Sequence, residues 1–184
     1  MQETIKGETC PTCFKKKLSL TEEEMDIPFF GKTFLFSMDC EACGFHKSDL
    51  EAEEPKEPCR LTFTIEKEED MKVRVVKSSE ATIKVPQLRM SVTPGPASEG
   101  YISNIEGVLT RFEKVIEGEK ESCEEEDAKT TAKNLLNKIR KAKWGEMPLK
   151  IIIEDPSGNS AIISERIQTE KLNLEKKTKK KRGS

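Results

Sequence analysis

The sequence predicts a mainly β protein in which a small cysteine-paired ribbon precedes an antiparallel β domain with an inserted helical hairpin. Three observations predict it. Two Cys-x-x-Cys pairs flank an apolar stretch near the N-terminus, apolar and polar residues alternate later in the chain, and a helical spacing interrupts that alternation. We expect a ribbon module over residues 1–50, a β domain over 51–170 with its hairpin at about 103–143, and a basic tail over 171–184.

The charge balance excludes some classes of partner. The 184 residues carry 32 basic and 34 acidic side chains, so the net charge is −2, and no whole-molecule field favours nucleic acid or an acidic membrane. No apolar run approaches the roughly 18–20 residues that cross a bilayer, and the N-terminus lacks the apolar core of a signal peptide. We therefore expect a cytoplasmic protein without a membrane partner, whose six cysteines are metal ligands or free thiols.

The stretch between the two cysteine pairs predicts the strands of the ribbon. Residues 27–38 are rich in phenylalanine, which suits a strand or a hairpin, and Gly31 is placed for a turn or bulge. The polar run over residues 51–58 has the composition of a linker. The ribbon therefore ends before the β domain begins.

Short alternating segments predict the first strands of the β domain. Residues 59–66 place Leu61, Phe63 and Ile65 on one face. The same alternation recurs over residues 71–77, 81–88 and 88–92. Pro86 falls between two strands, where its missing N–H costs little. The Pro- and Gly-rich residues 93–100 predict a loop.

A change of period then predicts two helices. Apolar residues recur at helical spacing from Ile102 onward. Ser103, with Glu106 three residues later, has the pattern of a capping box, and Gly118 is typical of a helix end. A second helix fits residues 124–143, whose first turn is acidic and whose last turn is basic, as the helix dipole favours.

Strands return after the helices. They are predicted over residues 149–153 and 160–164, and the residues between them, 155–158, read Asp-Pro-Ser-Gly, as in a type I turn. The final residues, KKTKKKRGS, contain nothing apolar and predict a solvated tail. Because strands precede and follow the helix pair, we predict a β-sandwich or barrel with the helical hairpin inserted in it.

The cysteine pairs predict one structural zinc ion. Structural zinc takes four ligands in a tetrahedron, and a Cys-x-x-Cys turn supplies two thiolates from one side. The two pairs are separated by 26 residues, which is room for the strands of a zinc ribbon. The predicted ligands are Cys10, Cys13, Cys40 and Cys43. Four thiolates leave no coordination position for a substrate water, so this zinc is not expected to be catalytic.

Alternatives for the thiols stay open. The four cysteines could be unrelated thiols or two redox pairs, and His46 could replace one thiolate. Cys59 and Cys123 fit buried or free thiols better than they fit ligands. The residues that follow the two pairs also differ, because Gly44 suits a knuckle turn and Phe14 suits it less well.

Five segments of the chain occur together in one order. They are CPTC, IPFFGKTFLFSMDCEACGF, VVKSSEATIKVPQL, NIEGVL and LKIIIEDPSGNS. In that order they resemble the ZPR-type zinc-finger protein family over nearly all of residues 10–164. The last segment is the most specific, since a generic zinc ribbon has no reason to carry it. Eukaryotic members of the family look like two copies of such a module, whereas this chain has one, similar to the shorter archaeal form.

The resemblance implies a fold and a partner. The fold is a zinc finger joined to a double-stranded β-helix with a helical hairpin, and the partner is translation elongation factor 1-alpha, which the family serves as a folding chaperone. Polar residues of the shared motifs are then the candidate partner contacts, namely Lys77, Ser78, Asp155, Asn159 and Ser160. The alternative is that these residues only shape turns and strand ends.

Two other classes of function compete with this one. An iron oxygenase on a β-helix needs several histidine ligands, and the sequence contains one histidine, His46. Asp155 and Ser160 suit a turn better than a catalytic triad. Nucleic-acid binding through the zinc ribbon and the KKTKKKR tail is the alternative function, although acidic residues 22–24 follow basic residues 15–17 closely. We predict a zinc protein that is not an enzyme and that binds a translation elongation GTPase.

Overall fold

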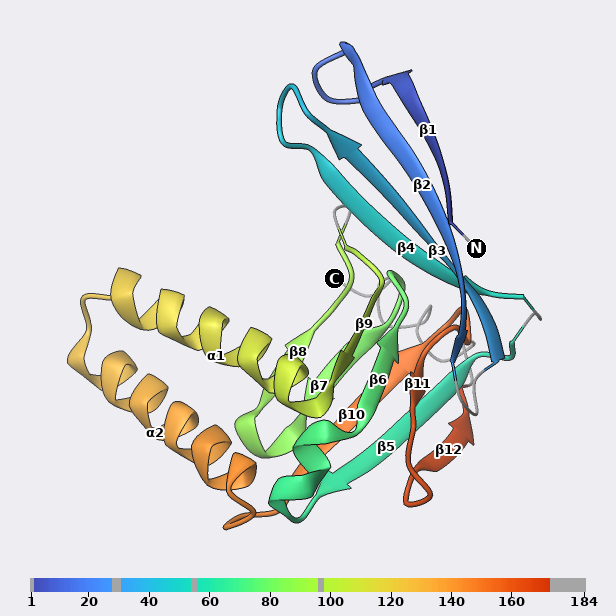
Figure 1. The fold of residues 1–184 in the computed structure, drawn as a ribbon. Coiled ribbons are helices and arrows are strands. Elements are labelled where there is room, and N and C mark those ends of the chain that lie inside the picture. Colours follow the sequence, from blue (N-terminus) through green and yellow to red (C-terminus); the bar gives the residue numbers. More distant parts are fainter. Residues whose placement is uncertain (1, 28–30, 54–55, 96–97, 173–184) are drawn as a thin grey trace, which may run out of the picture.

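The computed structural model describes residues 2–27, 31–53, 56–95 and 98–172. A long four-stranded sheet near the N-terminus rises from one end of a β-sandwich, and a helical hairpin extends from the side of that sandwich (Figure 1). Residues 173–184 of the predicted basic tail, and residues 54–55 of the predicted linker, lie outside the described residues.

The first sheet, sheet A, is an antiparallel meander in which each strand pairs with the next along the chain. Its strands are β1 (Gln2–Thr9), β2 (Lys16–Ile27), β3 (Gly31–Cys40) and β4 (His46–Ala52). The predicted turn at Gly31 lies where β3 begins, and its φ of +95° is one that glycine adopts readily. Sheet A buries residues mainly at its two ends, with Leu18 at one end and Ile27 and Leu50 at the other.

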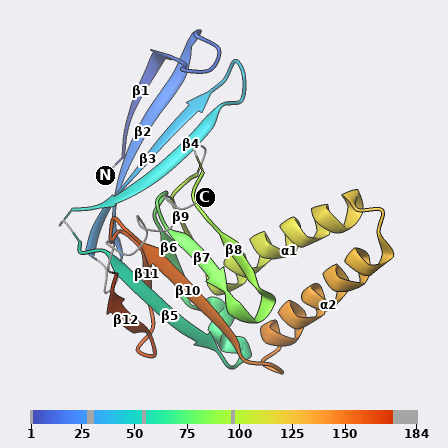
Figure 2. The ribbon, with the colours of Figure 1, turned by 180° about the vertical axis from the view of Figure 1, so that it is seen from behind.

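The β domain is a sandwich of two antiparallel sheets, with the order β12-β5-β10-β7-β8 in sheet B and β11-β6-β9 in sheet C. Sheet B contains β5 (Cys59–Ile65), β7 (Thr82–Val85), β8 (Met90–Val92), β10 (Leu149–Asp155) and β12 (Gln168–Lys171). Sheet C contains β6 (Arg74–Lys77), β9 (Tyr101–Asn104) and β11 (Ala161–Ile162). Because β10 lies between β5 and β7 (Figure 2), the chain after the hairpin completes a sheet that the chain before it began.

The alternation of β5 is confirmed, since Leu61, Phe63 and Ile65 are all buried. The predicted strand over residues 71–77 is shorter than expected. A 3-10 helix, η1 (Glu68–Lys72), occupies its start because the carboxylate of Asp70 accepts the N–H groups of Glu66 and Lys67. A second 3-10 helix, η2 (Pro86–Leu88), begins at the proline that was expected between two strands.

The hairpin consists of α1 (Ile105–Ser122) and α2 (Glu126–Lys143). The predicted capping box at Ser103 is wrong, because Ser103 pairs with Val75 in sheet C and the helix starts later. Asn104 is the N-cap, and its side-chain oxygen accepts the Gly107 N–H at 2.8 Å. The predicted stop at Gly118 is also wrong. Glycine inside a helix costs only about 1 kcal/mol, and α1 continues for another turn to Ser122.

The main core lies between the two sheets and the inner faces of the helices. Phe63 and Phe112 are its largest fully buried side chains, one from β5 and one from α1. A second, smaller core lies at the base of sheet A, where Ile27 and Leu50 pack with Val76 of β6. Sheet A is therefore joined to the sandwich by buried apolar contacts as well as by the chain itself.

Candidate metal centre and the junction below it

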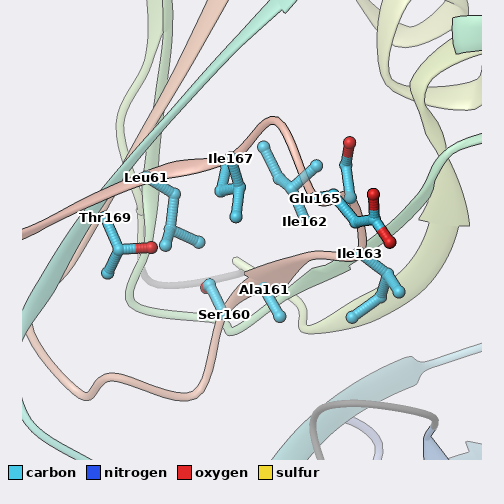
Figure 3. Close-up of a pocket in the computed structure, with 9 residues that line it drawn as sticks. Leu61, Ser160, Ala161, Ile162, Ile163, Glu165, Ile167 and Thr169 are labelled. Carbon is cyan, nitrogen blue, oxygen red and sulfur yellow. The ribbon is translucent and has the colours of Figure 1, made fainter.

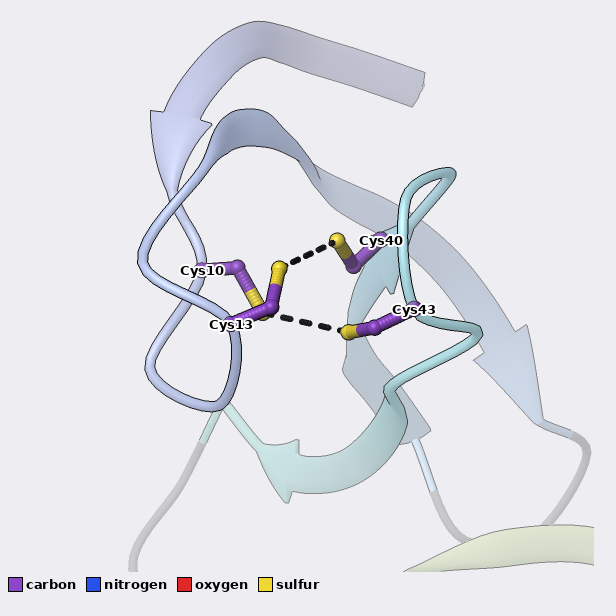
Figure 4. A group of neighbouring side chains, drawn as sticks. All are labelled: Cys10, Cys13, Cys40 and Cys43. Atoms are coloured by element: carbon purple, nitrogen blue, oxygen red, sulfur yellow. Dashed lines mark hydrogen bonds between the residues drawn. The ribbon is translucent and has the colours of Figure 1, made fainter.

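Four cysteine sulfurs meet at the far end of sheet A. Cys10 and Cys13 lie between β1 and β2, and Cys40 and Cys43 lie between β3 and β4 (Figure 4). Their sulfur atoms all lie within 4.8 Å of one another, and all four cysteines are free thiols. Residues that are far apart in sequence are thus gathered because sheet A brings its two cysteine turns to the same end.

The sulfur positions fit a tetrahedral metal ion. A tetrahedron with Zn–S bonds of about 2.3 Å has sulfur–sulfur edges of about 3.8 Å. The Sγ atoms of Cys10 and Cys43 are 3.7 Å apart, as are those of Cys13 and Cys40. The four soft donors therefore lie where zinc requires them, and they would occupy every position of a four-coordinate ion.

The two cysteine turns are built alike. In the first, the Phe14 N–H donates to the Cys10 carbonyl at 2.9 Å. In the second, the Gly44 N–H donates to the Cys40 carbonyl at 3.0 Å. Each turn closes the chain tightly enough to point both of its sulfurs to one side, which is why the Cys-x-x-Cys spacing predicts a shared ion.

The protein environment favours ionisation of one thiol. Burial alone would raise the pKa of Cys10, but N–H groups of Cys13 and Thr12 overcome this and lower the pKa to about 6. The Phe45 N–H lowers the pKa of Cys43, yet loss of water and the neighbouring sulfurs outweigh it and raise that pKa to about 12. The backbone is thus arranged to hold thiolate at Cys10, the protonation state that binds metal.

The other candidate ligands have different surroundings. The Nδ1 atom of His46 lies 2.6 Å from a carboxylate oxygen of Asp39, on the exposed surface of sheet A. Burial raises the pKa of the Cys59 thiol to about 11, and the nearby Asp155 adds to the shift. Cys123 ends α1. None of these three belongs to the sulfur cluster that the described residues form.

The five polar residues suggested as partner contacts come together, but mostly below the surface. Lys77, Ser78, Asp155 and Ser160 are buried, and only Asn159 is half-buried. The Ser78 hydroxyl donates to Asp155 at 2.9 Å, and the Ser78 N–H donates to the Ser160 hydroxyl at 3.0 Å. The Lys77 ammonium donates to the Ser78 carbonyl at 2.8 Å, and burial lowers the pKa of Lys77.

The turn after β10 is closed by a side chain. Asp155 accepts the Ser157 N–H at 2.8 Å and the Ser157 hydroxyl at 2.7 Å. Gly158 follows with a φ of +76°, and a Cβ there would come within 2.5 Å of the Glu57 carbonyl oxygen. The Asp-Pro-Ser-Gly segment is thus a turn packed against the chain that leaves sheet A.

Three contacts that the sequence did not predict hold sheet A on the sandwich. Asp49 accepts the Ser79 hydroxyl at 2.6 Å, and the Ala52 N–H donates to the Asn159 side chain at 3.2 Å. Ser48 and Gly100 exchange two hydrogen bonds, of 3.0 and 3.1 Å. We call these contacts the junction. Its partners are polar side chains and backbone groups on an edge strand and in loops, for which no periodic signal exists.

A hollow of about 510 Å³ lies between the end of β11 and sheet B. Its wall is mostly apolar, and Leu61, Ile162 and Ile167 are among the side chains that line it (Figure 3). Ser160, whose hydroxyl accepts the Ser78 N–H, is one of its lining residues.

Models of known protein domains match both sheet A and the β domain. A ZPR1 zinc-finger domain matches residues 4–55, and a ZPR1 jelly-roll domain matches residues 69–182. An uncharacterised ZPR1-like protein of Methanocaldococcus jannaschii is 38% identical over 98% of this chain and 92% of its own length. The zinc finger chaperone zpr1 of Schizosaccharomyces pombe is 31% identical over 83% of this chain, which corresponds to 33% of that longer protein.

The match and the geometry together identify the metal. A zinc-finger domain matches the residues that carry the four clustered thiols, so the ion is zinc and its role is structural.

In the described part of the chain, no helix is both long and apolar enough to cross a membrane.

Proposed function

The chain belongs to the ZPR1 family of zinc-finger proteins, and from that premise we propose that it binds a translation elongation factor 1-alpha type GTPase as a folding chaperone or assembly partner. The S. pombe relative is named a zinc finger chaperone, which supports the chaperone role. The GTPase is the client that the family resemblance implies, and we place the interaction in the cytoplasm.

The saturated thiolate cluster is the observation that carries this proposal. Cys10, Cys13, Cys40 and Cys43 are the proposed ligands, and with all four bound the zinc has no position left for a substrate or a water. The ion then contributes folding energy to sheet A rather than chemistry. What sheet A offers to other molecules is a surface, so binding is the function that the site supports.

The junction extends that surface across two units. Because hydrogen bonds and a small apolar core fix sheet A on the sandwich, one client can contact both units at once. Two weak contacts on one rigid body add to a strong one, since the second forms at high effective concentration. A chaperone must also bind the immature client more tightly than the mature one, because equal binding would shift no folding equilibrium.

The five polar residues take a specific part in this proposal. Lys77, Ser78, Asp155 and Ser160 are buried, so in this proposal they support the segments next to the junction and do not touch the client. Asn159 is half-buried at the boundary between the units, and it is the one of the five that reaches a client directly.

Titration calorimetry tests the function. The full chain is titrated with elongation factor 1-alpha of the same organism in nucleotide-free and GTP-bound forms. We expect tighter binding to the nucleotide-free form, and we expect the Cys40→Ser variant to lose binding because sheet A loses its zinc. Equal affinity for both forms would contradict a chaperone role. Binding to single-stranded RNA but to neither form of the GTPase would favour the nucleic-acid alternative.

A further inference from the structure

The two cysteine turns that hold the zinc site have the same pattern of backbone hydrogen bonds. In each turn, the residue after the second cysteine donates its N–H to the carbonyl of the first, at 2.9 Å for Phe14 and 3.0 Å for Gly44. In each, the N–H of the first cysteine donates to the carbonyl five residues later. The distance is 3.0 Å from Cys10 to Lys15 and 2.8 Å from Cys40 to Phe45. Phe14 therefore occupies the place that Gly44 occupies in the other turn.

Phenylalanine is the wrong residue for that backbone. The φ of Phe14 is +59° and that of Gly44 is +70°, both in the left-handed region. Glycine adopts this region freely, whereas a side chain with a Cβ is strained there. Among the described residues other than glycine, Arg89 is the one further residue with a positive φ. Folding of the turn alone would thus favour glycine at position 14.

The ring of Phe14 does not recover this strain by packing. Its side chain is 77% exposed, more than any other large apolar side chain in the described part of the chain. At the equivalent position, a Cβ added to Gly44 meets nothing within 4 Å, so this place in the turn faces open space. Phe45, one residue later in the second turn, does pack against the cysteine cluster. The ring of Phe14 is therefore largely exposed to solvent.

Charged residues of both signs are exposed on the two cysteine turns and on the strand end next to them. Residues 15–17 are three exposed lysines, and Glu8 and Glu41 are exposed on the neighbouring strand end and the second turn. The Glu41 N–H donates to the Lys17 carbonyl at 3.1 Å, so acidic and basic residues share this end of sheet A. A phosphate backbone would be attracted by the lysines alone, whereas a protein surface can match charges of both signs.

We propose that Phe14 is an anchor residue, whose ring enters an apolar pocket on a protein partner while residues 15–17 and Glu41 form the polar rim of the contact. This inference rests on the proposed function, and the partner it names is the same GTPase. Aromatic side chains surrounded by polar residues are typical centres of protein interfaces. Such an anchor explains why the chain keeps a strained, exposed phenylalanine beside its zinc.

The test separates strain from binding with three variants of the full zinc-loaded chain. Phe14→Gly removes the ring and relieves the backbone, Phe14→Tyr keeps the ring and the strain, and Ile5→Ala removes an exposed apolar group from β1. Affinity for nucleotide-free elongation factor 1-alpha is measured by calorimetry, and stability by urea unfolding. We expect Phe14→Gly to weaken binding roughly tenfold or more without lowering its unfolding midpoint. We expect Phe14→Tyr and Ile5→Ala to bind almost as wild type does.

Each contrary outcome has one meaning. If wild type binds and Phe14→Gly binds equally well, the anchor is wrong while the proposed function stands. If Phe14→Gly unfolds at lower urea and releases zinc, the ring serves the fold, and the anchor is again wrong. If wild type does not bind the GTPase in any form, the proposed function fails and the anchor fails with it. Tight binding to single-stranded RNA that is lost in Phe14→Gly would replace the protein partner with a nucleic acid.

Discussion

Asp49 of β4 accepts the hydroxyl of Ser79 at 2.6 Å, across 30 residues of sequence and across the boundary between sheet A and the sandwich. The other carboxylate oxygen accepts the Ser79 N–H at 3.3 Å and the Leu50 N–H at 2.8 Å. Ser79 directly follows the buried Lys77 and Ser78. A single carboxylate thus links the strand that leaves the zinc site to the polar group inside the β domain.

Removal of this carboxylate should loosen the junction. In an Asp49→Ala variant, Ser79 loses its acceptor, and we expect a loss of about 1.5–3 kcal/mol in the free energy of unfolding, the range for a hydrogen bond to a charged group. Urea unfolding measures this loss. Glu51→Ala is the matched control, since Glu51 is exposed on the same strand. Equal losses in the two variants would mean that the junction adds nothing.

Loss of zinc should unfold sheet A before it unfolds the sandwich. Cys40→Ser removes one of the four sulfurs, and we expect the protein to release its zinc and residues 2–52 to lose protection from hydrogen exchange. The core around Phe63 should keep its protection, because it lies between the two sheets of the β domain. Metal content and hydrogen exchange measure the two effects. Cys123→Ser is the control and should retain zinc; zinc loss in that variant would contradict the ligand assignment.

Asp70 should make the stability of the protein fall in acid. Burial raises the pKa of Asp70, but its contact with Arg166 and the N–H groups of Glu66 and Lys67 outweigh burial, so the pKa lies below its ordinary 3.8. A lowered pKa in the folded state adds stability above pH 3.8, which disappears as the pH falls through the folded value. We expect Asp70→Asn to cost about 1–3 kcal/mol at neutral pH.

The pH dependence distinguishes this charge from simple packing. Unfolding curves of wild type and Asp70→Asn, measured from pH 7 downward, should converge as the pH falls below 3.8 and through the lowered pKa of the folded state, because the wild-type carboxylate then becomes protonated. The control is Glu68→Gln, which removes an exposed carboxylate from the same 3-10 helix. A stability difference that stays constant with pH would show that the charge of Asp70 is not the cause.

Capping of α1 should depend on Asn104 and not on Ser103. The Asn104 side chain accepts the Gly107 N–H, and its loss in Asn104→Ala should cost about 1 kcal/mol in the free energy of unfolding. Ser103→Ala should cost less, since the position is held by strand pairing with Val75. Thermal unfolding of the two variants side by side measures the difference. The reverse order would restore the capping box that the sequence pattern suggested.

The sequence predicted most elements because their signals are local. The Cys-x-x-Cys spacing, the alternation of β5 and the apolar spacing of α1 each depend on neighbours a few residues away, and each led to the right kind of element. The ordered motifs also predicted the family, with its zinc finger and its β domain. The comparisons confirm all three. The misplaced capping box also has a local cause. Ser103 is still paired in β9, so the N-cap of α1 is the next residue, Asn104.

Only the tertiary structure decided how the two units meet and which polar residues are buried. Asp49 and Ser79 are 30 residues apart, and Ala52 and Asn159 are 107 apart, so no window of sequence contains both partners. The same holds for Ser78 and Asp155, which the shared motifs suggested as partner contacts and whose side chains lie inside. Spacing determines which residues a turn or strand can present, but burial depends on what the rest of the chain places against it.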